Sequence, residues 1–315
     1  MQDDNPRRTL DELATLYELE PEIKDIYVEG RSDKNFLEVH ILPGATSLLC
    51  NIFAVSDRVH IPDGELIKSG LMVGNRSRII WLAQQLADRI PGHASAVLVA
   101  DKDFSSLGAD KAQETHGLLY TDYSSMEAYA LNELTISKLL RISVGAPPYV
   151  TASSLISAIK ATLISLFVIR LCLRDSGTGA TIPPKVLTRW DLDDHSHVKV
   201  IDIFRSALSA IRADERGDAT PESLYEHYTE YIEQTKDEFK NFINGHDVSL
   251  AIVRYLKSEC SHVFNSDNRR PLQAPPVMEV VLMSCVETSH LDGEKLFEKL
   301  RRWIANMPHS SASAT

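Results

Sequence analysis

Six carboxylates follow three apolar stretches of the sequence, each close to the point where an expected β-strand ends. Loops and helix N-termini converge at the carboxyl ends of parallel strands, so ligands gather there. Acids crowded at such an edge repel one another unless cations neutralise them. Oxygen ligands without Cys or His favour Mg²⁺ or Mn²⁺, and two such ions can hold both reacting oxygens of a phosphodiester. The six residues are Glu29, Asp33, Asp101, Asp103, Asp122 and Glu127.

The six acids are not equivalent. Asp33 lies four residues after Glu29, on the first turn of an expected helix, so both side chains can face one crevice. Asp122 precedes two serines and suits a helix cap or turn better than a metal site. We therefore expect metal ligands at Glu29, Asp33, Asp101, Asp103 and Glu127. Three basic residues lie near them in the sequence and could contact phosphate, namely Arg31, Lys34 and Lys102.

The elements that would position these acids are predicted by hydrophobic periodicity. Residues 8–20 form an expected amphipathic helix with Thr9 as its N-cap. The alternation of apolar stretches then predicts a mainly parallel sheet with helices on both faces, an α/β fold. The expected order is strand 26–28, helix 32–41 capped by Ser32, strand 48–55, helix 75–89, strand 94–100, strand 117–121 and a helix from Ser124 or Ser125.

The rest of the chain is predicted to be helical. The expected helices span 133–142, 151–173, 198–213, 221–241, 247–258, 276–287 and 293–307. Gly, Pro and Ser predict a break at 144–148 and loops at 175–185 and 265–276. The predicted organisation is an N-terminal helix at 1–20, an α/β domain at 21–132, a helical domain at 133–307 and a disordered tail at 308–315.

Composition limits the class of protein. The 315 residues are 43% hydrophobic, enough for a real core, and carry a formal net charge of −11, which repels nucleic acid at long range. Nucleic-acid binding would therefore need local basic groups or divalent metal. Four scattered cysteines without zinc spacing predict reduced thiols and a cytoplasmic setting. The stretch Ala161–Ile169, between Lys160 and Arg170, predicts a buried helix and no membrane span.

Two of the motifs resemble a known family. The stretch Val28–Leu37 (VEGRSDKNFL) resembles the first motif of the Toprim domain, and Val99–Phe104 (VADKDF) resembles its Asp-x-Asp motif, in the same order and strand placement. In Toprim domains the glutamate serves acid/base chemistry or metal binding, and the paired aspartates hold Mg²⁺. The resemblance implies a Rossmann-like fold and assigns catalytic roles to Glu29, Asp101 and Asp103.

A longer resemblance, to the DUF4435 group and the OLD-like nucleases, covers roughly residues 20–290, whereas the Toprim part covers about the first 130. Tyr120–Tyr129 is similar to the stretch in which a helical glutamate adds a metal ligand, a role that falls on Glu127. Phe242–Val248 is similar to a Gly-His-Asp element of the helical half. OLD-type sites also use a lysine that this sequence does not place.

The DUF4435 group includes the Toprim nuclease subunit of PARIS anti-phage systems, which attacks tRNA beside an ABC-type ATPase. The resemblance thus implies a Mg²⁺- or Mn²⁺-dependent nuclease of DNA or RNA that acts as the toxic effector of a bacterial anti-phage defence system. This chain has no Walker-type phosphate loop, so any ATPase is a separate polypeptide. No membrane partner is expected, and a homodimer is compatible with the apolar helices.

Two rival functions stay open. A phosphatase of haloacid-dehalogenase type also has Asp-x-Asp at a strand end, but Phe104–Ser105 fits it poorly and Glu29 would have no role. A non-catalytic module could instead use the helical half to dock an ATPase. Several other motifs are better explained as solvated turns, caps or faces than as sites, namely Asp191–His197, His246–Asp247, Arg269–Arg270 and Arg301–Arg302.

Overall fold

The computed structural model describes residues 7–42, 50–107, 114–187, 197–212, 214, 216–235 and 238–306. Its contacts divide the chain into two compact units. The first unit comprises Met1–Asp101, Ala112–Asp122 and Thr288–Thr315, and the second comprises Lys102–Lys111 and Tyr123–Glu287. The predicted boundary at residue 132 lies inside the second unit, and the first unit includes the C-terminal residues from Thr288, which the sequence had placed in the helical domain.

The first unit is built on a four-stranded sheet, and its strands are β1 (Lys24–Val28), β2 (Cys50–Ala54), β3 (Ala96–Ala100) and β4 (Leu118–Tyr120). The strand order is β2-β1-β3-β4 and every pair is parallel, which confirms the predicted parallel sheet with helices. All residues of β1 and β3 are buried, as in central strands covered on both faces. The carboxyl ends of these two central strands therefore meet at one edge.

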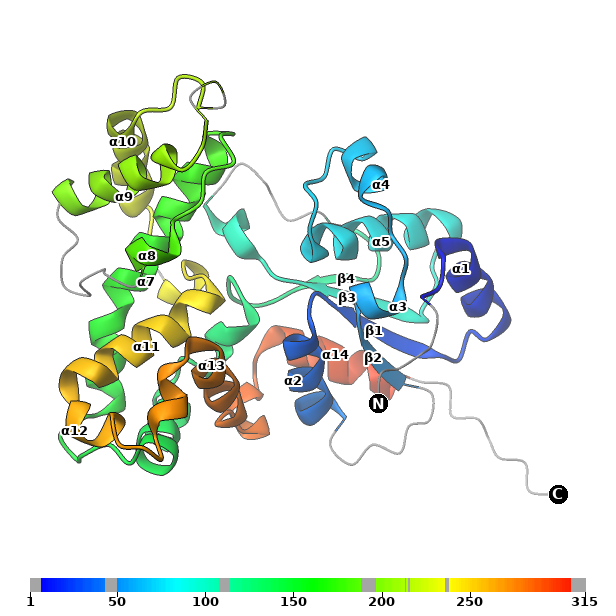
Figure 1. Ribbon diagram of the computed structural model, residues 1–315. Helices are drawn as coiled ribbons and strands as arrows, with labels where there is room; N and C mark the ends of the chain where they lie inside the picture. The colour runs from blue at the N-terminus through cyan, green and yellow to red at the C-terminus, as the bar shows by residue number, and fades with distance from the viewer. Residues whose placement is uncertain are drawn as a thin grey trace. The chain divides into compact units, whose positions relative to one another are not determined.

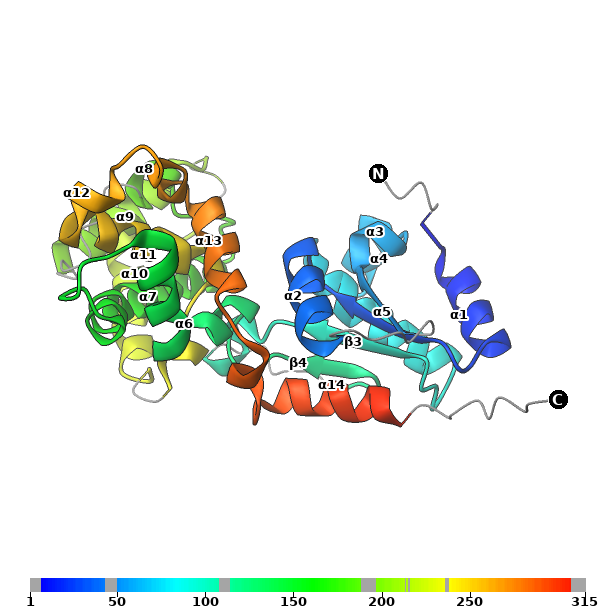
Figure 2. The same cartoon turned by 90° about the horizontal axis from the view of Figure 1, so that it is seen from below.

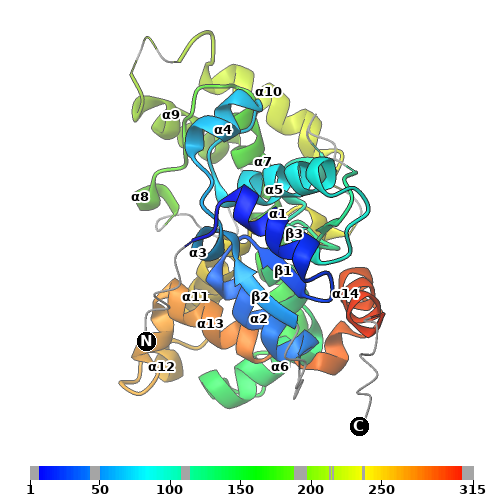
Figure 3. The same cartoon turned by 90° about the vertical axis from the view of Figure 1, so that its right-hand side faces the viewer.

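Helices cover both faces of this sheet (Figure 1 and Figure 3). Helix α2 (Arg31–Ile41) contacts β1 and β2, and α14 (Lys295–Ala305) contacts α2, with Phe297 edge-on to Phe36 at 6.1 Å. On the other face α5 (Asn75–Arg89) contacts β3, and α1 (Leu10–Leu19) lies beside α5. Alternate strand residues such as Tyr27 and Leu98 enter the core beneath α5.

The first turns of two helices test the N-cap residues that were predicted from the sequence. Thr9 caps α1, because its hydroxyl accepts a hydrogen bond from the N–H of Glu12, so that prediction is confirmed. Ser32 does not cap α2; that prediction is wrong, since α2 begins at Arg31 after the N-cap residue Gly30. Two short helices, α3 (Val55–Arg58) and α4 (Asp63–Lys68), were not predicted.

The second unit is organised around α7 (Ala152–Asp175), which matches the predicted helix 151–173 (Figure 2). It contacts α9 (His197–Ser209), α10 (Pro221–Ile232) and α11 (Gly245–Glu259). Among the described helices, α7 alone is long and apolar enough to cross a membrane. However, 61% of its most apolar 18-residue stretch is buried inside the protein. This burial agrees with the predicted core helix.

Several other predicted helices are shorter or divided. The expected helix from Ser124 or Ser125 is the 3₁₀ turn η2 (Met126–Ala130), and 133–142 divides into α6 (Glu133–Lys138) and the π-helix η3 (Leu139–Val144). The predicted helix 221–241 ends at Ile232. The remaining elements are η1 (Asp103–Ser106), α8 (Pro184–Leu187), η5 (Phe239–Asn241), α12 (Ser261–Phe264), η6 (Arg270–Gln273), α13 (Pro275–Ser284) and η7 (Thr288–Leu291).

Some predictions lie outside the described residues, namely the tail 308–315, the first two residues of the predicted strand 48–55 and most of Asp191–His197. All four cysteines are buried free thiols, as the sequence predicted.

Candidate functional site

Glu29 and Asp101 meet at the carboxyl edge of the sheet. Glu29 follows the last residue of β1 and Asp101 follows the last residue of the neighbouring strand β3. The backbone N–H of Asp101 donates a hydrogen bond of 2.8 Å to Glu29 Oε1. The register of two buried parallel strands therefore fixes the Glu29 carboxylate against the start of the Asp-Lys-Asp motif.

Asp33 is directed at its own helix. Its Oδ2 accepts a hydrogen bond of 3.0 Å from the backbone N–H of Gly30, the N-cap residue of α2. An acid in this position stabilises a helix N-terminus, both by hydrogen bonding and through the helix dipole. Among the residues that the structure describes, Glu29, Asp33 and Asp101 do not bring three ligand oxygens within 4.8 Å of one another. The structure thus brings Glu29 to Asp101 and gives Asp33 a capping contact.

Arg76, which the sequence interpretation overlooked, lies at the same edge. It is the second residue of α5, and its Nε donates a hydrogen bond of 2.9 Å to the carbonyl oxygen of Asp101. Within the described residues, its two terminal NH₂ groups make no hydrogen bond or ion pair. A guanidinium anchored through Nε, with both terminal groups available, is a standard arrangement for binding phosphate oxygens.

The three basic residues predicted to contact phosphate have other surroundings. Arg31 forms a two-point ion pair with Asp57 of α3, with an Nε–Oδ2 distance of 2.7 Å. Lys34 pairs with Glu38 one helical turn away, at 3.6 Å. Lys102 is half-buried in the second unit. Arg31 and Lys34 are thus already engaged with acids on the surface of the first unit.

Asp103 has an uncommon backbone conformation. Its φ is +47°, and it is the one non-glycine residue with positive φ in the described part of the chain. Its N–H donates a hydrogen bond of 2.8 Å to the carbonyl oxygen of Ser124, which holds this conformation. Aspartate tolerates the left-handed region better than most residues, and such strain concentrates at functional sites.

Asp122 acts as a helix cap, although for an unexpected helix. Its Oδ2 accepts a hydrogen bond of 3.0 Å from the N–H of Leu296, in the first turn of α14. The cap role favoured from the sequence is therefore present, but the helix that it caps lies near the C-terminus rather than next in the chain. Asp122 has a structural role that does not need a metal.

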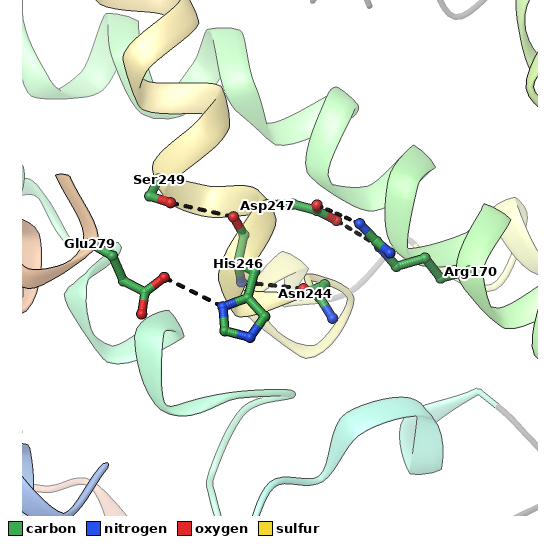
Figure 4. A network of polar contacts seen from close by, with 6 residues as sticks. All are labelled: Arg170, Asn244, His246, Asp247, Ser249 and Glu279. Carbon is green, nitrogen blue, oxygen red and sulfur yellow. Dashed lines mark hydrogen bonds and ion pairs between the residues drawn. The ribbon is translucent and has the colours of Figure 1, made fainter. Parts of the chain in front are cut away.

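A second group of potential ligands lies within the second unit. Glu127, His246 and Glu279 each offer one ligand atom, and these atoms all lie within 4.8 Å of one another, a geometry that could hold a metal ion. Glu127 belongs to η2, His246 to the first turn of α11, and Glu279 to α13. His246 Nδ1 is 3.4 Å from Glu279 Oε2 (Figure 4). We call these three residues the Glu-His-Glu cluster.

The charges of the Glu-His-Glu cluster influence one another. Burial raises the pKa of Glu127, whose residue is only 8% exposed, and the nearby Glu279 raises it further. The hydrogen bond to Glu279 raises the pKa of His246, and Glu127 adds to this effect. A cation among these side chains would relieve the repulsion between the two glutamates. The cluster therefore has the electrostatic character of a cation site.

The start of α11 positions His246. Asn244 is the N-cap residue, and its side chain accepts a hydrogen bond of 3.2 Å from the His246 N–H. Asp247 forms a two-point ion pair with Arg170 of α7, at 2.9 and 2.7 Å (Figure 4). The prediction that His246–Asp247 caps this helix is thus wrong, because Asn244 does so. Asp247 instead holds α11 against α7.

Sequence reasoning found Glu127 but missed His246 and Glu279 as its neighbours. The three lie far apart in the chain, and only the packing of η2 and α13 against α11 brings them together. The available signal was the Asn-Gly-His sequence at a helix start, which places the histidine in an exposed first turn. Comparison with protein-family models gave no match, and neither did comparison with curated proteins.

Proposed function

We propose that this protein is a divalent-metal-dependent nuclease that hydrolyses phosphodiester bonds. The observation that carries the proposal is the contact between Glu29 Oε1 and the N–H of Asp101, at the carboxyl ends of two adjacent parallel strands. This is the edge at which open parallel sheets bind their ligands. The resemblance of both stretches to Toprim motifs supports the same chemistry.

The donor set suits a hard divalent cation. Glu29 and Asp101 supply carboxylate oxygens, the ligands that Mg²⁺ and Mn²⁺ prefer. Asp103 follows Asp101 by two residues in the chain and is included on the strength of the Asp-x-Asp motif. The resemblance to OLD-like nucleases assigns a metal-ligand role to Glu127 as well, and its neighbours within the second unit are His246 and Glu279. When bound, the metal would activate water and stabilise the charge that develops on the phosphate.

Protein groups supply the remaining steps. Glu29 is oriented by the Asp101 N–H, and this fixes it to accept a proton from the attacking nucleophile. Arg76 is anchored on the Asp101 carbonyl, and its terminal NH₂ groups would bind the phosphate as negative charge builds up. Arg76 thus occupies the role for which the sequence offered no lysine.

The biological role is proposed on resemblance. The nuclease would act as the toxic effector of a bacterial defence system, with tRNA among its substrates and a separate ABC-type ATPase as its controller. A chain with a net charge of −11 needs metal and local cations to approach such a polyanion.

The test is a cleavage assay with plasmid, single-stranded DNA and total tRNA, each with Mg²⁺, with Mn²⁺ and with chelator. We expect cleavage that depends on metal and is lost in Glu29→Gln and Asp101→Asn. Glu65→Gln is the matched control, because Glu65 pairs with Lys68 on the surface of the same unit. Full cleavage by Glu29→Gln and by Asp101→Asn, together with full toxicity of both variants in cells, would refute the proposal.

A further inference from the structure

We propose that the Glu-His-Glu cluster is a metal site, which binds Mn²⁺ or Zn²⁺ in preference to Mg²⁺. The site is formed entirely within the second unit, by Glu127, His246 and Glu279. Glu29 and Asp101, which carry the proposed nuclease activity, are not among its ligands. The sequence resemblance supports only Glu127 as a metal ligand, and the histidine and second glutamate come from the packing of the helices.

The arrangement of the three side chains resembles a three-ligand metal site with an open position. Glu127 is buried, the Glu279 side chain is 17% exposed and the His246 side chain is 82% exposed. Glu127 thus lies at the base of the cluster and His246 at its outer side. An ion can reach the buried carboxylate from solvent, and water or a substrate group can complete its coordination.

A second observation points to a ligand at the same place. The hydroxyl oxygen of Ser125 is buried beside Glu127 and stabilises the charge of that carboxylate, but within the described residues no partner meets full hydrogen-bond geometry. A Cβ built on Gly245 would overlap the Glu127 carboxylate and would lie 2.9 Å from Ser125 Oγ, so both side chains face the same point of the backbone. A buried hydroxyl without a partner is costly. It faces the base of the cluster, where an ion or its water would satisfy it.

Gly245 allows this arrangement. It is the first residue of α11, and the absence of a side chain lets the helix backbone approach Glu127 closely. The start of a helix carries partial positive charge, which partly compensates a buried carboxylate. The arginine–aspartate pair of Arg170 and Asp247 fixes α11 beside α7 (Figure 4). The histidine is therefore presented from a rigid element, as a metal ligand requires.

The type of donor decides the preferred ion. Two carboxylates alone would suit Mg²⁺, but an imidazole nitrogen favours first-row transition metals, whose affinities rise from Mn²⁺ towards Zn²⁺ in most such sites. This differs from the all-oxygen set proposed for Glu29 and Asp101. We therefore expect Mg²⁺ to bind the cluster more weakly than Mn²⁺, on the order of tenfold.

The experiment is a titration of the full, metal-stripped chain with Mn²⁺. Binding is measured by the loss of the free-ion signal in electron paramagnetic resonance. The Glu29→Gln/Asp101→Asn double variant removes the proposed ligands of the first unit. We expect one Mn²⁺ binding event to survive in this background. Zn²⁺ should displace the bound Mn²⁺, and an equal concentration of Mg²⁺ should not.

His246→Ala and Glu279→Gln, made in the same background, should weaken this binding by about tenfold or more. The matched control is His227→Ala, which removes an exposed histidine of α10 in the same unit. Circular dichroism checks that each variant is folded, which His246→Ala should be because its side chain is mostly exposed.

The outcomes separate the two proposals. Binding unchanged by His246→Ala and Glu279→Gln, or no Mn²⁺ or Zn²⁺ binding in the double variant, would overturn the metal site while leaving the nuclease proposal standing. Metal binding at the cluster without any nucleic-acid cleavage would do the reverse. Mg²⁺ binding as tight as Mn²⁺ binding would overturn the assigned preference.

Discussion

The two units present their candidate ligands by different means. In the first unit Glu29 and Asp101 follow adjacent parallel strands, and one backbone hydrogen bond joins them. In the second unit Glu127, His246 and Glu279 come from three helical elements, and no strand register relates them. The first arrangement follows from the sheet, whereas the second depends on how helices pack.

This difference has consequences for the chemistry. Residues at strand ends are fixed by main-chain pairing, so an exchange of carboxylate for amide should remove function and leave the fold intact. Residues gathered by helix packing depend on close backbone approach, so a single added methyl group could disturb them without touching any ligand. Variants of each unit can therefore test whether strand pairing positions Glu29 and Asp101, and whether helix packing positions the Glu-His-Glu cluster.

The largest effect is expected from Arg76→Ala in the first unit. Removing the guanidinium anchored on Asp101 should lower kcat by about 10²–10³-fold, as for other preorganised donors to a developing anion. The control is Arg89→Ala, in the last turn of the same helix, where the arginine pairs with Asp11 instead. Steady-state cleavage rates of both variants provide the measurement. Equal rates for the two would remove Arg76 from the proposed chemistry.

Gly245→Ala tests the second unit without changing a ligand. Its Cβ would overlap the Glu127 carboxylate, so we expect Mn²⁺ affinity to fall by about tenfold, the usual size for disturbing the support of a metal ligand. Gly64→Ala is the matched control, because nothing lies within 4 Å of the added Cβ in α4. Calorimetric titration of both variants gives the comparison. Unchanged affinity in Gly245→Ala would mean that Glu127 does not bind the ion.

The same contrast explains what the sequence could reveal. Glu29 and Asp101 were predicted to meet because buried apolar stretches identify strands, and parallel strands bring their carboxyl ends together. His246 was predicted to be part of a cap, since periodicity identifies a helix but not the neighbour that its first turn will contact. Glu279 carried no signal, because a single glutamate on a helix is usually a solvated residue.

Capping was the other source of error. Ser32 matches the residue preference of an N-cap, yet Gly30 occupies that position and Asp33 supplies the hydrogen bond. Local preference was overridden by the end of β1, which places the turn two residues earlier than expected. Asp122 was predicted to be a cap, but its partner in α14 is distant in sequence and no local pattern could identify it.

Asp122→Ala tests whether this acid serves the fold or the chemistry. Loss of the hydrogen bond to Leu296 should lower the free energy of unfolding by about 1 kcal/mol, as for other helix caps. Nuclease activity should be retained. Asp292→Ala is the control, because its exposed ion pair with Arg301 should contribute less. Urea denaturation measures the stability of both variants. If Asp122→Ala had normal stability but no nuclease activity, Asp122 would instead belong to the proposed catalytic site with Glu29 and Asp101.

The smallest effect is expected at Asp25, the acid near the opposite end of β1 from Glu29. Its Oδ2 accepts a hydrogen bond of 2.8 Å from the Tyr17 hydroxyl, and burial raises the pKa of Asp25. Tyr17 and Tyr27 stay neutral, since burial also raises the pKa of each hydroxyl. Asp25 is thus a buried acid of the first unit with a structural role, which makes it a reference for Glu29.

The direction in which Asp25 changes the stability with pH follows from the difference between its pKa in the folded and unfolded chain. Below the ordinary pKa of about 3.9 the carboxyl is protonated in both states, so its burial costs little. As pH rises, the unfolded chain releases the proton first, and stability is lost until the pH passes the raised pKa of the folded state. Asp25→Asn removes this dependence, because an amide does not titrate, and its oxygen can still accept the hydrogen bond from the Tyr17 hydroxyl. The stability of the variant relative to the natural chain should therefore increase with pH over this range, by about 0.5 kcal/mol. Urea midpoints measured from about pH 4 to about pH 8 provide the test, and a difference that does not vary with pH would show that Asp25 is not held as a buried acid.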